Sequence, residues 1–336
     1  MLKKTGFAIA AVMVLTLAGC SFGKQNIEID PKAGAKIGAP VREDEAVSCP
    51  SDVTVHMETI EIEGLTEEHE IVFTADNHIS LWDERDSLVA NKAKERYETF
   101  KSWDGAYADE SFKSVIQYVR SENPELLVIG GDLLDSAMYA GIDFASGQLS
   151  TIKVPYLYGM GNHDFEYDNE YFSDRAFKEY LPRLSALSGI DKGYRTAQFD
   201  EYIVLIADDY GNKVSPDALE ELIRINKLGK PIIVSVHVPI EPGIGNSLWE
   251  MSKQVWGQTS DGTSKVLLGN RSIIPNDVTT AFLDEMRKNE SNVKVVLAGH
   301  VHFYHKDMLN DNIIQLVAGP GYNKEVTKII LKPKEN

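Results

Sequence analysis

Short apolar runs alternate with amphipathic segments along most of the chain, and this alternation is the feature that most restricts the fold. The runs have the composition of buried strands and cover Ile71–Phe73, Leu126–Ile129, Val154–Tyr158, Tyr202–Ala207, Ile232–Val236, Val293–Ala298, Ile313–Val317 and Val326–Leu331, after an alternating Val53, Val55 and Met57. Helical spacing is present at about 84–101, 110–121, 168–186, 215–228 and 276–289. The pattern predicts a layered α/β sandwich in a single domain.

Polar clusters follow five of these runs directly. They are Asp76-Asn77-His78, Gly131-Asp132, Gly161-Asn162-His163-Asp164, His237 and Gly299-His300-Val301-His302, and they contain five of the eight histidines in the chain. In open α/β sheets, functional sites form beyond the carboxyl ends of the strands, so we expect the five clusters to converge.

The residue types in these clusters indicate metal binding. Side-chain nitrogen and oxygen donors without cysteine suit Mn²⁺, Fe or Zn²⁺ rather than an iron–sulfur cluster. The two pairs with i, i+2 spacing, Asp76/His78 and His300/His302, are expected on one side of an extended backbone. Adding Asp132, Asn162 and His237 gives more donors than one ordinary ion needs, and the set suits two ions that share a carboxylate, an arrangement that serves phosphate ester hydrolysis.

Each motif also has a structural interpretation when it is taken alone. Asp76 is a candidate helix cap or turn residue, Asn162 a turn former, Asp164 a surface ion-pair partner, and Asp135-Ser136 a helix start. Short motifs have a high false-positive rate singly. The occurrence of five motifs in order, each after a predicted strand, favours the metal site, and we interpret Asp135 as mainly structural.

The ordered motifs D-x-H, G-D-x-x-D, G-N-H-D, a lone H and G-H-x-H resemble those of the calcineurin-like metallophosphoesterase superfamily over residues 71–302. The resemblance implies a β-sandwich flanked by helices and two divalent metal ions. It assigns Asp76, His78 and His302 to the first ion, Asn162, His237 and His300 to the second, and Asp132 to both.

The resemblance also implies a catalytic role for His163, which would stabilise transition-state charge and protonate the leaving group, with Asp164 orienting it. The implied reaction is attack of a metal-bound hydroxide on a phosphate mono- or diester. Purple acid phosphatases have a tyrosine ligand three residues after the bridging aspartate, where this chain has Asp135, so no iron–tyrosinate centre is expected.

Two long, weakly patterned stretches, 79–110 and 239–275, are candidates for substrate selection. The second contains Trp249, Trp256 and Arg271. The tryptophans are candidates to stack a base or sugar and Arg271 to pair with a distal phosphate, although tryptophan in a helical segment more often packs into the core.

Composition excludes general nucleic-acid binding. The chain has 34 Lys and Arg against 51 Asp and Glu, a net charge of −17, whereas such binding depends on cationic side chains that displace counterions. A small phosphorylated molecule is the expected substrate. Cys20 and Cys49 allow one disulfide at most, which excludes a disulfide-stapled scaffold.

The N-terminus has the features of a secretory signal. Lys3 and Lys4 precede an apolar stretch at 6–18, and Leu17-Ala18-Gly19-Cys20 resembles a bacterial lipobox. We therefore expect a signal peptide at 1–19, a lipidated Cys20 with a flexible tether at 20–50, and a catalytic domain at 51–336. This predicts an extracytoplasmic protein held at the membrane by its lipid, with ordinary signal cleavage as the alternative.

Two other interpretations are compatible with size and lipobox. The chain would be a membrane-anchored solute-binding lipoprotein, or a family member without hydrolytic activity. A binding protein needs neither a dinuclear donor set nor His163 beside it, and all expected ligand types are present. The metal motifs therefore favour an enzyme.

Overall fold

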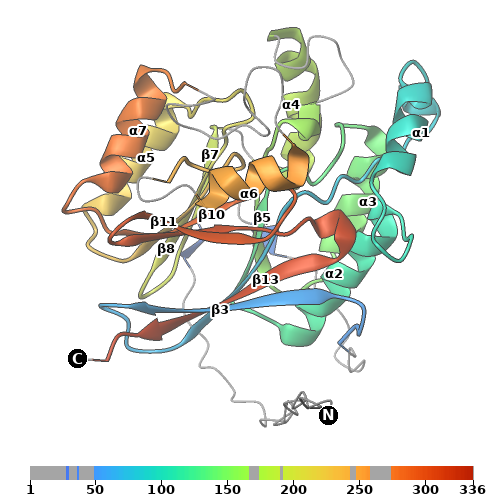
Figure 1. The fold of residues 1–336 in the computed structure, drawn as a ribbon. Helices are drawn as coiled ribbons and strands as arrows, with labels where there is room; N and C mark the ends of the chain where they lie inside the picture. Colours follow the sequence, from blue (N-terminus) through green and yellow to red (C-terminus); the bar gives the residue numbers. More distant parts are fainter. Residues whose placement is uncertain are drawn as a thin grey trace, which may run out of the picture.

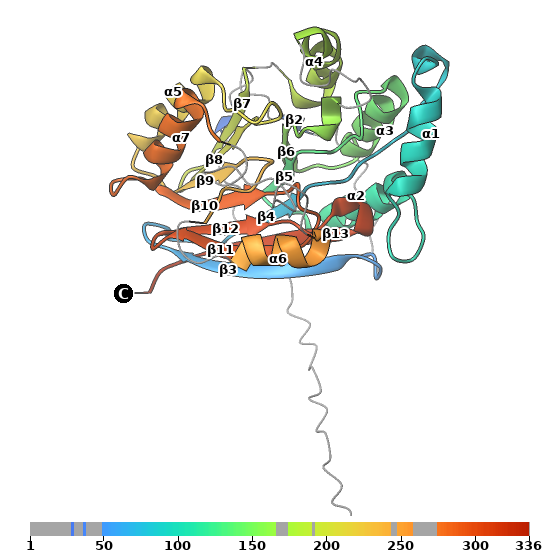
Figure 2. The ribbon, with the colours of Figure 1, turned by 45° about the horizontal axis from the view of Figure 1, so that its top comes forward.

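Two mixed β-sheets stack face to face and carry helices on their outer faces (Figure 1). The computed structural model describes residues 28–29, 36–37, 49–165, 174–189, 192–242, 247–257 and 274–335. Viewed from another direction, α5 and α7 lie on one side of the sheets and α2 and α3 on the other (Figure 2).

The first sheet has six strands. Their spatial order is β2 (Lys36–Ile37), β6 (Pro155–Gly159), β5 (Leu126–Gly130), β4 (His69–Thr74), β13 (Glu325–Pro333) and β3 (Thr54–Ile62). β4, β5 and β6 are mutually parallel, whereas β13 is antiparallel to β4 and parallel to β3. The carboxyl ends of the three central strands therefore lie together.

The second sheet has seven strands. Their order is β1 (Glu28–Ile29), β7 (Tyr194–Gln198), β8 (Ile203–Ala207), β9 (Ile232–Ser235), β10 (Val293–Ala298), β12 (Ile313–Val317) and β11 (His305–Asn310). β8, β9, β10 and β12 run parallel, and β7 and β11 are antiparallel to their neighbours. The ends of β9 and β10 supply the second half of the polar clusters.

Side chains alternate between the two faces of each central strand, which explains why these strands are apolar throughout. In β4, Ile71 and Phe73 pack between the sheets, while Val72 packs beneath the helices. In β8, Val204 faces the inter-sheet core and Leu205 faces the outer helices. Because such a strand is buried on both faces, its sequence is a continuous apolar run, as is usual for parallel strands covered by helices.

The helices form the outer layers. They are α1 (Ala90–Thr99), α2 (Ala108–Glu122), α3 (Tyr139–Leu149), α4 (Asp174–Ser188), α5 (Pro216–Asn226), α6 (Ser247–Trp256) and α7 (Asp277–Arg287), with short 3₁₀ turns at Glu84–Asp86, His163–Phe165 and Gly321–Asn323. α2, α3 and α4 cover the six-stranded sheet, whereas α5, α6 and α7 cover the other. The predicted layered sandwich flanked by helices is confirmed.

The segment expected to be a flexible tether contains two short paired strands. β1 pairs with β7, and β2 pairs with β6, so each lies at the edge of one sheet. The other residues up to 48, which include Cys20 and the expected signal, lie outside the described residues. In the part of the chain that the structure describes, no helix is both long and apolar enough to cross a membrane.

Candidate dinuclear metal centre

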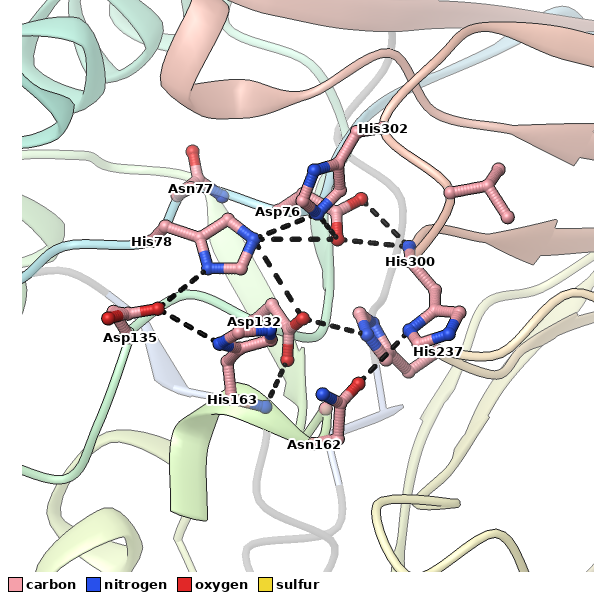
Figure 3. A network of polar contacts seen from close by, with 12 residues as sticks. Asp76, Asn77, His78, Asp132, Asp135, Asn162, His163, His237, His300 and His302 are labelled. Carbon is pink, nitrogen blue, oxygen red and sulfur yellow. Dashed lines mark hydrogen bonds and ion pairs between the residues drawn. The ribbon is translucent and has the colours of Figure 1, made fainter. Parts of the chain in front are cut away.

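All seven predicted ligands lie just beyond the carboxyl ends of five strands and converge on one place (Figure 3). Asp76 and His78 follow β4, Asp132 follows β5, Asn162 follows β6, His237 follows β9, and His300 and His302 follow β10. Because these strands are parallel within each sheet, their ends meet at the same pole of the sandwich. The predicted convergence is confirmed.

One group of donors comprises Asp76, His78, Asp132 and His302, whose ligand atoms all lie within 4.8 Å of one another. The Nε2 atoms of His78 and His302 are 3.0 Å apart. His302 Nε2 lies 3.5 Å from Asp76 Oδ1, and His78 Nε2 lies 3.9 Å from Asp132 Oδ2. Four nitrogen and oxygen donors around one point match the ligand needs of a divalent ion.

A second group comprises Asp132, His237 and His300. His237 Nε2 lies 3.0 Å from Asp132 Oδ2, and Asn162 Oδ1 is 3.0 Å from His300 Nδ1. Asp132 belongs to both groups and lies between them in Figure 3. One carboxylate is therefore placed to serve two ions.

The side chains of this centre fit two divalent cations. Asp132 Oδ2 and His237 Nε2 are buried and lie 3.0 Å apart, and apart from this ion pair neither atom has a hydrogen-bond partner among the described residues. Asp76 and Asp132 are both fully buried, and two uncompensated carboxylates in such a place would be costly. Cations between the two groups would satisfy these atoms.

The protonation states of His78, Asp76 and Asp132 suit metal binding. Burial lowers the pKa of His78 to about 4, so its ring is neutral near pH 7, the form that binds metal. Burial alone would raise the pKa of Asp76, but the neighbouring His302 lowers it to about 2, so the carboxylate is ionised. Burial opposes ionisation of Asp132 as well, and the charge of His237 outweighs it and lowers that pKa. Burial would lower the pKa of His237, but Asp132 raises it to about 10, so that ring must release a proton to bind a metal.

The backbone at the ligands differs from the expected extended form. Asp76, His78, Asp132, His300 and His302 have φ of 55°, 49°, 50°, 74° and 55°, all in the left-handed region. Non-glycine residues there cost on the order of 1–3 kcal/mol each and collect at functional sites. The prediction of extended D-x-H and H-x-H pairs was wrong, because each strand ends before its ligands and the chain turns sharply there.

Hydrogen bonds hold these strained turns. His78 N–H donates to Asp132 O at 2.9 Å, and His300 N–H donates to the Asp76 carboxylate at 2.9 Å. A Cβ at Gly161 would lie 2.2 Å from Asp132 Oδ1. Glycine at that position therefore lets the loop after β6 approach the shared carboxylate.

His237 shows how the second layer of contacts sets a ligand's orientation. Its Nδ1 donates to Gly130 O at 3.0 Å, which leaves Nε2 facing Asp132. Its backbone N–H donates to Asp209 Oδ1 at 2.9 Å. A ligand histidine fixed through its other ring nitrogen is the usual arrangement at metal sites.

The structure corrects the expected partner of His163. Asp164 is fully buried and accepts three backbone N–H groups, from Asp132, Leu134 and Gly161, at 3.0, 2.9 and 2.8 Å. It ties the loop after β5 to the loop after β6 instead of orienting the His163 ring. Its role is to hold the loop that carries Asp132.

Asp135, interpreted from sequence as mainly structural, is the carboxylate beside His163. Asp135 Oδ1 lies 2.9 Å from His163 Nδ1 and 3.3 Å from His78 Nδ1. The His163 backbone N–H donates to Asp132 Oδ1 at 2.8 Å. Position 135 lies within the G-D-x-x-D motif, so the sequence held a signal for this residue. No motif marked Arg96, which binds Asp135 from α1.

The two tryptophans of the stretch 239–275 have different surroundings. Trp249 is buried in the core under α6 and follows the packing interpretation. Trp256 is 41% exposed, its ring lies 5.6 Å from that of His302, and its Nε1 donates to Val301 O at 2.7 Å. Arg271 lies outside the described residues.

The fold and the two groups of possible metal-binding side chains match what is expected of a metal-dependent hydrolase of phosphoric esters. Residues 69–304 match the family model of the calcineurin-like phosphoesterases, and the chain belongs to this family. It is therefore a hydrolase of phosphoric esters.

Similarity to individual known proteins is distant. A dimetal phosphatase from Danio rerio has 12% identity and a TM-score of 0.46, over 76% of this chain and 88% of that chain. A purple acid phosphatase from yellow lupin (Lupinus luteus) seeds has 15% identity and a TM-score of 0.44, over 78% of this chain and 45% of that chain. No curated protein matches the sequence.

Proposed function

We propose that the protein hydrolyses a small phosphate mono- or diester at a centre of two divalent ions, Mn, Fe or Zn. The observation that carries the proposal is the position of Asp132, whose carboxylate belongs to both donor groups. Bound there, two ions supply Lewis-acid charge to the phosphate oxygens and activate water for attack on phosphorus.

The side chains divide the work around the substrate. Asp76, His78 and His302 would hold one ion, and Asn162, His237 and His300 the other. His163, fixed by Asp135 through Nδ1, is placed to stabilise charge on the phosphate and to pass a proton to the leaving oxygen through Nε2.

Local charge favours an anionic substrate although the chain is acidic overall. The proposed ligands include only two carboxylates, Asp76 and Asp132, against two divalent cations. The occupied centre is thus net positive, and bound ions are the largest charges in such a site. A small phosphate ester can therefore be attracted to a molecule with a net charge of −17.

The deciding experiment compares metal-stripped protein with the same protein reloaded with Mn²⁺, on 4-nitrophenyl phosphate and bis(4-nitrophenyl) phosphate. Metal-dependent turnover is expected, and the preferred ester identifies the substrate branch. Two bound metals without turnover of either ester would contradict the proposal and favour the solute-binding or inactive alternative.

We also propose that the protein is an extracytoplasmic lipoprotein. The support is the sequence alone: two lysines, an apolar stretch and small residues directly before Cys20. A lipid on Cys20 would keep the catalytic domain near the membrane surface.

A further inference from the structure

The segment before α2 brings a basic side chain to the metal centre from outside the motif set. Arg96 lies in the last turn of α1, and its side chain is 17% exposed. Arg96 Nε donates to Asp135 Oδ2 at 2.8 Å, and Nη2 donates to Asp135 Oδ1 at 2.7 Å. A two-point guanidinium–carboxylate pair fixes orientation as well as charge.

The carboxylate that Arg96 holds is the one that contacts two histidines of the centre. Asp135 Oδ1 is 2.9 Å from His163 Nδ1 and 3.3 Å from His78 Nδ1. Arg96 Nη2 is itself 3.0 Å from His163 Nδ1. Any rotation of Asp135 would therefore change the contacts of both rings.

A second residue near the end of α1 supports the same arrangement. Phe100, four positions after Arg96, stacks on the His78 ring with centroids 3.9 Å apart and planes 5° apart. The Arg96 guanidinium lies 4.8 Å from the centre of the Phe100 ring. Arg96 and Phe100 thus contact each other and the two histidines that Asp135 joins.

We propose that Arg96 is a positioning residue for hydrolysis: it locks Asp135, and through Asp135 it sets the ring of His163 at the leaving group. The inference deepens the proposed function and rests on it. As water bonds to phosphorus and gives up one proton to solvent, the ester P–O bond breaks and a proton moves from His163 Nε2 to the departing oxygen; solvent then reprotonates His163. A misplaced His163 ring would slow this transfer.

The kinetic test uses the holoenzyme with phenyl and 4-nitrophenyl esters of whichever type it prefers. The phenolate of a phenyl ester needs a proton more than 4-nitrophenolate does. Arg96→Gln should therefore lower kcat for the phenyl ester about tenfold more than for the 4-nitrophenyl ester, a part of the 10²–10⁴ that a positioned acid contributes. KM and metal content should stay close to the wild-type values. For Arg96→Lys, kcat for the phenyl ester should lie between those of the wild type and Arg96→Gln.

Arg183 provides a matched control. Its side chain is 16% exposed, and Nη1 donates to Asp86 Oδ1 at 2.9 Å and to Ala137 O at 3.2 Å, contacts that involve neither Asp135 nor a proposed ligand. Arg183→Gln should lower the unfolding temperature without changing the ratio of the two kcat values. An equal fall of kcat for both esters in Arg96→Gln, with metal retained, would overturn the proposal in favour of a structural role.

A second measurement needs no turnover. In metal-free protein with ¹⁵N-labelled histidine, the Nδ1–H of His163 should give a slowly exchanging signal, assigned by its loss in His163→Asn. Arg96→Gln should broaden or abolish this signal, and Arg183→Gln should preserve it. An unchanged signal in Arg96→Gln would refute the lock even if the wild type hydrolysed no ester, an outcome that would contradict the proposed function separately.

Discussion

At the scale of single residues, the centre depends most on one carboxylate. Asp132 is fully buried, has a φ of 50° and is a member of both donor groups. Its backbone N–H donates to Asp164, and its Oδ1 accepts from the backbone of His163. The loop after β6 therefore holds Asp132 at two points, through its backbone N–H and through its carboxylate.

We predict that Asp132→Asn abolishes binding of the second ion. An amide offers one neutral oxygen in place of a charged group that two ions share, so kcat should fall on the order of 10²–10³-fold, as when one preorganised electrostatic group is removed. Elemental analysis and hydrolysis rates measure the two effects.

Asp143→Asn is the control, because that side chain is 65% exposed and pairs only with Arg85 in the described contacts. It should leave metal content and rate unchanged. Two ions per chain and full activity in Asp132→Asn would refute the shared-ligand assignment.

The site could be predicted from sequence to the extent that motifs follow strands. All seven predicted ligands converge as expected because each lies next to a recognisable apolar run. The partner of His163 was missed because Asp135 and Asp164 are both close in sequence to ligands, and only the turn after β6 decides which carboxylate reaches the ring. Arg96 comes from a separate helix, and no local pattern encodes such a contact.

At the scale of elements, α6 carries two tryptophans with different surroundings. Trp249 is 8% exposed within the core, and Trp256 is 41% exposed beside His302. We predict that Trp249→Ala lowers the free energy of unfolding by about 3–5 kcal/mol. Trp256→Ala should cost only about 1 kcal/mol, the worth of its hydrogen bond to Val301, and should raise KM for aryl esters several-fold.

Chemical denaturation and steady-state kinetics measure these effects. An unchanged KM in Trp256→Ala would contradict a substrate-facing role for this ring. A stable Trp249→Ala variant would contradict its assignment to the core.

A buried histidine links the two sheets at the amino ends of β4 and β8. His69 Nδ1 lies 3.1 Å from Glu125, and Nε2 lies 2.9 Å from Glu201, which precedes β8. Burial alone would lower the pKa of His69, but the two glutamates raise it above its usual value. For Glu201 the signs are reversed: burial alone would raise its pKa, but hydrogen bonds from Thr66 and His69 lower it to about 2.

We therefore predict a pH window for this link. The raised pKa of His69 adds stability below about pH 6.5, and that stability is lost as pH rises through the folded pKa. The lowered pKa of Glu201 adds stability above about pH 4.3, and that is lost as pH falls towards 2. Near pH 5.5, the free energy of unfolding of the wild type should exceed that of His69→Asn by about 1–3 kcal/mol.

Urea unfolding from pH 4 to pH 9 checks this window. The difference between wild type and His69→Asn should shrink as the pH approaches 9. A difference that is constant over the whole range would show that His69 acts through packing alone.

The elements that sequence reasoning missed lack strong periodicity. α3 contains two glycines and small residues, and β11 is an edge strand in which polar residues dominate. β7 was also missed, and the segment that forms α6 was described as helical without being placed among the predicted helices, whereas the apolar central strands were placed correctly. Burial on both faces gives a strand a clear composition, and edge strands and covering helices are stabilised by contacts that local sequence does not show.

At the scale of the whole molecule, the proposed lipoprotein signal would decide where the enzyme works. We predict that the wild type incorporates labelled palmitate and fractionates with membranes, whereas Cys20→Ser does neither, because a lipobox cysteine is the acylated residue. Labelling and fractionation of expressing cells measure this. Equal membrane association of both forms would favour an uncleaved apolar anchor.

The control for this experiment is Cys49→Ser. Cys49 is an exposed free thiol in the structure, so its replacement should alter neither labelling nor fractionation. Loss of label in Cys49→Ser would point to a different acylation site.

The pairing of β1 and β2 with the two sheets limits how far the catalytic domain can lie from Cys20. With lipid on Cys20, eight peptide steps separate it from Glu28, the first residue paired with β7. Fully extended, those steps span at most about 28 Å. The linker between the lipid and the domain would therefore be short, and it would join the domain on the side where β6 and β7 lie. The catalytic domain would then stay close to the bilayer surface with a restricted orientation, and its substrates would come mainly from the layer of solution next to the membrane.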